Sequence, residues 1–220
     1  PIVSDAALEA NITNEGGVYG TYRLLKNLTG LWIIQQCRAA WEAEGQSYSY
    51  GQLVELSQAE TALRSFIDVN DAAFLPLGDH PQKVREYCSR TSQPVPETPG
   101  AVVRVVLESL ALAYRLTLEK LIAVSGQPVD VIHIVGGGIQ NELLNQVTAN
   151  ATGRTVIAGP IEATVIGNAL VQLIAQGEIS DISEGRQMVA GMDSWKRYDP
   201  QEAAAWEDAY QRYKHLLKIS

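Results

Sequence analysis

The sequence predicts an α/β protein that is rich in helices and contains a small parallel βαβα unit. A β-branched run at 129–135 ends in three glycines, and a helical stretch and a second apolar strand at 154–158 follow it. Apolar residues at helical spacing dominate the rest of the chain. Short apolar strands that alternate with helices pair in parallel through right-handed crossovers, so their glycine turns should meet at one edge of the sheet.

Apolar spacing and a capping signal predict two helices in the first quarter of the chain. Leucines repeat at helical spacing over 22–44, where we expect the first helix. Ser49 followed by Gln52 is a capping-box pattern, which predicts a second helix over about 49–66. Residues 66–77 are expected to form a short strand or an extended loop.

Two further helices should begin with a capping residue and a proline in the first turn. Asp79 precedes a helix that should extend to about residue 92. Thr98 and Pro99 begin a long helix, which Gly126 can end in the left-handed conformation. The density of apolar residues along that long helix indicates that it is largely buried.

Three more helices complete the prediction. Two of them belong to the βαβα unit, at 141–151 and 163–175, and each is followed by a glycine. The last helix should be capped by Asp199. One of its faces carries an aromatic stripe that we interpret as core packing: Trp206, Tyr210 and Tyr213.

Composition and charge exclude several classes of function. The 220 residues carry 17 Lys+Arg and 25 Asp+Glu, a net charge of −8 with no basic run, so no nucleic-acid partner is expected. The uncharged stretch 163–177 is shorter than the ~20 apolar residues that span a bilayer, and no secretory signal is present, which predicts no membrane contact and a cytoplasmic location. Cys37 and Cys88 lack metal or redox spacing and should be reduced.

The triple glycine Gly136-Gly137-Gly138 is the most informative candidate site. Residues without a β-carbon let backbone N–H groups approach a phosphate or a ribose, which favours nucleotide binding. A tight turn without a ligand explains the glycines equally well. Asn141 replaces the third glycine of a dinucleotide motif and Val156 replaces its acidic residue, which disfavours a nicotinamide-dependent dehydrogenase.

Other polar residues do not form a recognisable site. Asp68, Asn70 and Asp71 lack the glycine and the terminal Glu of a calcium-binding loop. The histidines lie far apart in the sequence, and His133, inside an apolar strand, is expected to be a buried imidazole with satisfied hydrogen bonds. We therefore predict no catalytic residue and no metal ligand in this chain.

Four segments carry a resemblance to a known family: TNEGG (13–17), RLLKNLTGLW (23–32), HIVGGGIQN (133–141) and VIAGPIEA (156–163). In this order they resemble the C-terminal part of the rhamnulokinases, which belong to the FGGY carbohydrate kinases. The LKN-x-x-GLW block separates the rhamnulokinases from xylulokinases and glycerol kinases. The similarity covers nearly the whole chain.

The resemblance implies an RNase H-like fold of the actin/Hsp70-type ATPase superfamily, with residues 1–220 as the C-terminal nucleotide-binding domain. It implies a parent enzyme that transfers the γ-phosphoryl group of ATP to L-rhamnulose and yields L-rhamnulose 1-phosphate. Asn27 falls where the family contacts the sugar, and Gln35 and Gly137 fall where it contacts ATP, with Gly136 and Gly138 beside them. On one helix, Asn27 and Gln35 would lie about 12 Å apart along the axis, at two ends of a cleft.

Two motifs of the family do not occur in the sequence: His-Asp-Thr, which holds the catalytic Asp, and Ser-Ser-Gly-Thr-Trp. The chain also begins with Pro1 rather than Met. We therefore expect a piece of a longer kinase whose N-terminal domain supplies the base and the magnesium ligands, and we expect the chain alone to be inactive. The alternative is a non-catalytic nucleotide-binding or assembly module. A truncated sheet can leave an unpaired edge that a second copy of the chain can cover, so a homo-oligomer stays open as one arrangement.

Overall fold

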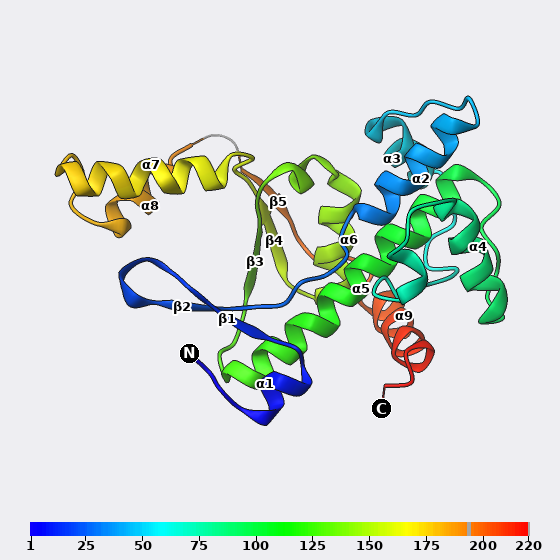
Figure 1. Ribbon diagram of the computed structural model, residues 1–220, viewed down its shortest axis with the longest axis horizontal. Helices are drawn as coiled ribbons and strands as arrows, with labels where there is room; N and C mark the ends of the chain where they lie inside the picture. The colour runs from blue at the N-terminus through cyan, green and yellow to red at the C-terminus, as the bar shows by residue number, and fades with distance from the viewer. Residues whose placement is uncertain (193–194, 220) are drawn as a thin grey trace.

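The computed structural model describes residues 1–192 and 195–219. Helix α5 (Pro99–Ser125) runs diagonally through the molecule, with a helical part around its first half and a small sheet beside it (Figure 1). The helical part contains α2 (Trp32–Ala43), α3 (Tyr50–Gln58), α4 (His80–Arg90) and α9 (Ala203–Leu216). A short α1 (Asp5–Glu9) lies near the N-terminus. Among the described residues, no helix is both long and apolar enough to cross a membrane.

The predicted caps of α3, α4 and α5 form as expected. The Ser49 hydroxyl accepts a hydrogen bond from the Gln52 N–H, and the Gln52 side chain accepts one from the Ser49 N–H, which completes the capping box of α3. Asp79 caps α4 and Thr98 caps α5. Gly126 ends α5 with φ 66°, a left-handed conformation that glycine adopts at little cost.

The sheet confirms the predicted parallel unit and adds one strand to it. β3 (Val131–Ile134) and β4 (Thr155–Ala158) are parallel, and α6 (Glu142–Thr152) connects them. Their glycine turns meet at one edge, because the Gly159 N–H donates to the Ile134 carbonyl (2.9 Å) and the Gly136 N–H donates to the Pro160 carbonyl (3.2 Å). β5 (Lys196–Tyr198) pairs antiparallel with β4, so the sheet is mixed.

The first predicted helix, 22–44, is wrong over residues 22–31. β1 (Thr13–Gly16) and β2 (Tyr22–Leu25) form an antiparallel hairpin there, and α2 begins only at Trp32. Pairing with β1 outweighs the helical spacing of the leucines in this segment. Gly30, with φ 59°, keeps the chain out of a helix just before α2.

The second helix, predicted to extend to residue 66, ends earlier at Gln58. The backbone beyond it is held by side chains of α5 and of a loop instead of by helical hydrogen bonds. The Leu63 N–H donates to Glu108 (2.8 Å) and the Ile67 N–H donates to the Ser109 hydroxyl (2.9 Å). Residues 66–77 form the expected extended loop, with a 3₁₀ turn at Ala72–Phe74.

Two helices extend from the end of the sheet, α7 (Ala163–Gln176) and α8 (Ile182–Ala190), at the upper left of Figure 1. α7 confirms the predicted helix, and Gly177 ends it with φ 76°. α8 was not among the helices predicted from the sequence. Its cap is Asp181, which accepts hydrogen bonds from the N–H groups of Ser183 and Glu184.

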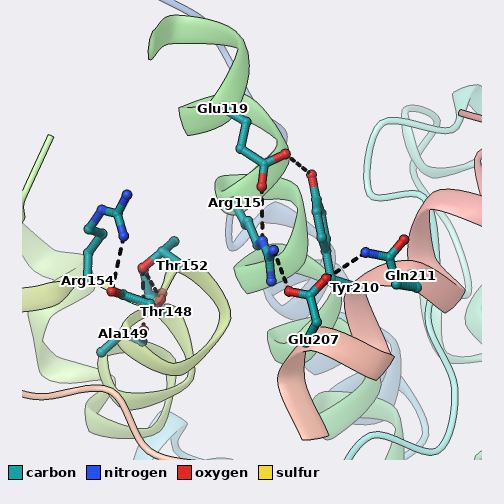
Figure 2. Close-up of polar contacts among 10 residues, drawn as sticks. Arg115, Glu119, Thr148, Ala149, Thr152, Arg154, Glu207, Tyr210 and Gln211 are labelled. Carbon is teal, nitrogen blue, oxygen red and sulfur yellow. Dashed lines mark hydrogen bonds and ion pairs between the residues drawn. The ribbon is translucent and has the colours of Figure 1, made fainter. Parts of the chain in front are cut away.

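The main core lies between α2, α4, α5, α6 and α9, and it contains the predicted aromatic stripe of α9. Figure 2 shows how α9 is fixed to α5 at the edge of this core. Arg115 of α5 contacts Glu119 (3.0 Å) and Glu207 of α9 (2.7 Å), and its guanidinium lies 3.8 Å from the centroid of the Tyr210 ring. The Tyr210 hydroxyl donates to Glu119 (2.5 Å).

The predicted cap of the last helix is wrong. α9 begins at Ala203 after Glu202, which makes no side-chain capping bond. Asp199 instead accepts hydrogen bonds from the Thr155 hydroxyl (2.8 Å) and from Arg197. The carboxylate is therefore used to join the end of β5 to β4 rather than to cap a helix.

Candidate functional site

The glycine turn connects the end of β3 to the beginning of α6. Gly136 has φ 81°, and residues Gly137–Gln140 form a single 3₁₀ turn. Asn141 then caps α6, because its side-chain oxygen accepts a hydrogen bond from the Leu144 N–H (2.9 Å). The local sequence therefore combines a left-handed glycine, a tight turn and a capped helix within six residues.

The three glycines are required for different reasons. Gly136 needs its positive φ, so turn geometry alone explains it. Gly137 and Gly138 do not have a left-handed φ, and a β-carbon on either would meet no atom of the described chain within 4 Å. Their N–H groups have no acceptor among the described residues. A ligand that binds to the backbone requires open space beside it and N–H groups that are free to donate, and this part of the turn offers both.

A cavity of about 720 Å³ opens on this turn and lies between it and the helices α2 and α3. Gln35, Gly137 and Gly138, three of the five predicted site residues, line it. Its volume lies in the range of small-molecule sites. The other lining residues are Leu31, Ile34, Tyr50, Gly51, Leu53, Val54, Glu55, Gln58, Val103, Gln140, Asn141 and Glu142.

Gln35 is presented to the cavity by the amphipathic pattern of α2. Ile33, Ile34 and Cys37 are buried against the core, whereas Gln35 is exposed on the other side of the helix. Its amide can both donate and accept hydrogen bonds, as the edge of a base or a ribose requires.

Asn27 does not lie on the same helix as Gln35, so that expectation is wrong. It lies in the loop between β2 and α2, where its side chain is exposed, and it does not line the cavity. Its neighbour Lys26 fixes this loop by donating to the Ala10 carbonyl (2.6 Å). Gly136 directly precedes the 3₁₀ turn and also lies outside the lining of the cavity.

The cavity contains acidic but no basic side chains. Glu55 comes from α3, and Glu142 comes from the first turn of α6, where it forms an ion pair with Lys196. The lining residues include no Lys, Arg or His. An uncharged group such as a purine or a ribose suits these walls better than a triphosphate does, and only the free N–H groups of the turn offer donors to an anion.

The wall of the cavity that α3 supplies was not predicted from the sequence. Tyr50, Gly51, Glu55 and Gln58 belong to no motif, and only the capping box marked their helix. Apolar spacing along α3 identifies Leu53 as a core residue, whereas Gly51, Glu55 and Gln58, spaced four and three residues apart, share another face of the helix. No sequence signal shows that this face lies opposite the glycine turn.

His133 is exposed, so the expectation of a buried imidazole is wrong. β3 is an edge strand of the described sheet, and His133 lines a cavity together with residues of the helices α7 and α8. It makes an edge-on contact with Trp195, with 6.2 Å between the ring centroids. In the described part of the chain, no three His, Cys, Asp or Glu side chains come together as metal ligands.

Comparisons with known sequences identify a family. Residues 1–176 match the profile of the FGGY family of carbohydrate kinases, C-terminal domain. A rhamnulokinase from Bacteroides thetaiotaomicron is 44% identical over 218 residues, which are 99% of this chain and 44% of that protein. A rhamnulokinase from Bacillus subtilis is 39% identical and matches 92% of this chain and 41% of that protein. The chain thus spans less than half the length of these curated relatives.

Comparisons with solved structures support the same fold. A ligand-bound xylulose kinase from Lactobacillus acidophilus superimposes on 100% of the chain and 44% of its own length, with a TM-score of 0.68 and 16% identity. A gluconate kinase from the same organism superimposes on 94% of the chain and 42% of its own length, with a TM-score of 0.68 and 15% identity. At these identities the likeness establishes the α/β fold of the chain.

Proposed function

The chain belongs to the FGGY family of carbohydrate kinases, whose C-terminal domain it carries, and from this membership we propose that it forms the adenine-nucleotide side of a sugar kinase cleft. The observation that carries the proposal is the cavity that joins Gln35 to the glycine turn. Residues 1–220 would then act as the C-terminal nucleotide-binding domain of a longer enzyme, with Gly136 shaping the start of the turn through its positive φ.

Each part of the cavity suits one part of the nucleotide. The apolar side chains of α2 and α3 can cover the faces of a purine, and the Gln35 amide can bond to its edge or to the ribose. Gly137 and Gly138 would let the first phosphate approach the backbone N–H groups. Mg²⁺ would arrive on the nucleotide phosphates, and we assign its protein ligands to a part of the enzyme outside these 220 residues.

We propose L-rhamnulose as the acceptor, with transfer of the γ-phosphoryl group to its 1-hydroxyl and L-rhamnulose 1-phosphate as the product. The relatives named rhamnulokinase support this assignment. The role of Asn27 as a sugar contact rests on its place in the LKN-x-x-GLW block. Its exposed position leaves the side-chain amide available to hydroxyl groups of a sugar.

Phosphoryl transfer needs an activated hydroxyl and a metal-clamped γ-phosphate in line with it. The His-Asp-Thr sequence that supplies the family's base does not occur in residues 1–220. On the proposed function, residues 1–220 are therefore expected to be inactive without the rest of the enzyme. A coupled assay of the chain with L-rhamnulose and Mg-ATP should therefore show no sugar-dependent release of ADP, and measurable turnover would contradict the proposal.

Nucleotide binding itself is tested by calorimetric titration of the chain with ADP. Gln35→Ala removes one hydrogen bond at the cavity, worth about 1 kcal/mol, and should raise Kd about fivefold. Gln36→Ala is the matched control, because Gln36 follows on the same helix and does not line the cavity. A wild-type chain that binds no adenine nucleotide, or two variants with equal affinities, would contradict the assignment of this cavity.

A further inference from the structure

Asn145, on the second turn of α6, is the buried side chain that contacts the glycine turn from behind. It is 0% exposed, and its Nδ2 donates a hydrogen bond of 2.8 Å to the Ile139 carbonyl. Its Oδ1 has no hydrogen-bond partner, although it is buried. A reversed amide would place Oδ1 against the Ile139 carbonyl oxygen, so the Ile139 contact fixes the orientation of the side chain.

An unpaired acceptor in the interior destabilises a fold, and buried polar groups in native proteins are nearly always bonded. The neighbouring polar side chains of α6 follow that rule. Thr148 and Thr152 are also buried, and each hydroxyl donates to a carbonyl of its own helix, at 2.6 and 2.7 Å. Asn145 differs from them because its bond leaves the helix and ends on the turn. A leucine would fill the same space without an unpaired oxygen, but it would release Ile139.

Backbone bonds also act on this turn. The Gly136 N–H donates to the Pro160 carbonyl (3.2 Å), the Ile139 N–H donates to the Gly136 carbonyl (3.2 Å), and the Asn141 N–H donates to the Gly138 carbonyl (3.1 Å). Glycine has the largest backbone freedom to lose, so three in succession favour disorder of the turn. The Asn145 amide supplies a direct side-chain bond from the core to the middle of this segment.

We propose that Asn145 is a positioning residue for nucleotide binding: it anchors the Ile139 carbonyl and thereby keeps the N–H groups of Gly137 and Gly138 directed at the cavity. Asn145 does not line the cavity and does not touch the ligand. The effect on nucleotide affinity rests on the proposed function, whereas the effect on the order of the turn does not.

The experiment measures both quantities on the whole chain. Asn145→Leu keeps a buried side chain of similar size and removes the bond to Ile139. We expect the hydrogen-exchange protection of the Ile139 and Asn141 amides to fall about tenfold or more, and Kd for ADP to rise about fivefold. The matched control is Thr148→Val, which removes a buried hydroxyl of the same helix that bonds only to Leu144. It should leave both quantities within about twofold of the wild-type values.

Unchanged protection of the turn in Asn145→Leu overturns the proposal, and so does lost protection with unchanged ADP affinity. If the turn loses protection but the wild-type chain binds no ADP, the anchoring of the turn is supported and the proposed nucleotide site fails.

Should the leucine variant not fold, Asn145→Asp gives the same test with an isosteric side chain. Its carboxyl can donate to the Ile139 carbonyl only when protonated, so protection relative to wild type should recover as the pH falls. Absence of that recovery also overturns the proposal.

Discussion

Replacing Gly137 with valine should weaken nucleotide binding without weakening the fold. The backbone at Gly137 is outside the left-handed region, and a β-carbon there would meet no atom of the described chain within 4 Å. The added methyl groups would instead occupy the part of the cavity next to the free N–H group. A ligand displaced from that donor loses a hydrogen bond to a charged group, worth about 1.5–3 kcal/mol, which is about a tenfold to a hundredfold increase in Kd.

Calorimetric titration with ADP, together with thermal unfolding of each variant, measures the two effects separately. Gly16→Val is the matched control, because Gly16 also lacks a left-handed φ and has nothing within 4 Å of its β-carbon position. Gly16 lies in β1, away from the cavity. The control should bind ADP as the wild type does, and all three proteins should unfold at similar temperatures.

Gly136→Val should behave in the opposite way. Its φ of 81° is unfavourable for a side chain, so the variant should lose about 1 kcal/mol or more of unfolding free energy. The reasoning is refuted if Gly137→Val keeps both the wild-type unfolding temperature and the wild-type affinity, because the space beside Gly137 would then not belong to the nucleotide site.

Two further predictions concern buried ionisable groups. Glu108→Ala should lower the unfolding free energy by about 3–5 kcal/mol, measured in urea, because Arg104 and the Leu63 N–H lose their buried acceptor. Burial raises the pKa of Glu108 even though Arg104 opposes the shift, so its contribution to stability is present below the ordinary value of 4.5 and is lost as the pH rises through the folded pKa. Glu108→Gln should remove that part of the pH dependence, and an unchanged profile would contradict the assignment. Burial raises the pKa of Cys88 to about 11 and also raises that of Cys37, so a thiol reagent should find almost no fast-reacting group in the folded chain and two after denaturation without reductant. Fewer than two would contradict our proposal that the protein works in a reducing compartment.

Sequence signals that act within one turn of a helix predicted the structure well. The caps at Ser49, Asp79 and Thr98 and the left-handed end at Gly126 depend on contacts between residues three or four apart. The parallel β3–β4 pair was also predictable, because the β-branched runs and their glycines are local signals and the crossover rule supplies the direction.

Elements that depend on distant partners were not predictable in the same way. Leu24 and Leu25 fit a helix and a strand equally well, and only pairing with β1 decides between the two structures. β5 has three residues, two of them charged, and it is a strand because β4 is beside it. Asp199 had the right residue type for a cap, but a bond to Thr155 used it instead.

The candidate site also contains residues that the sequence predicted and one that only the structure shows. The glycines were predicted from the strand and turn pattern and Gln35 from the family resemblance, and the cavity brings Gln35, Gly137 and Gly138 together. Asn145 carries no motif, and its importance depends on the position of its side chain behind the turn. The bond to Ile139 and the unpaired oxygen become visible only when burial and hydrogen bonds are known atom by atom.

The charges around the cavity lead to a final prediction, that the chain binds ADP and ATP with similar affinities. Glu55 and Glu142 border the cavity, and its lining contains no basic side chain that would receive a γ-phosphate. The two free N–H groups of the glycine turn can serve one phosphate, and a further phosphate gains no partner while it adds negative charge near two carboxylates. The two dissociation constants, measured by calorimetry with Mg²⁺ present, should therefore agree within about threefold, with any difference in favour of ADP. Added salt should reduce the repulsion and bring the two values closer. A preference for ATP of about tenfold, or 1.4 kcal/mol, would show that residues 1–220 hold a γ-phosphate site, and the assignment of phosphate handling to another part of the enzyme would then be wrong.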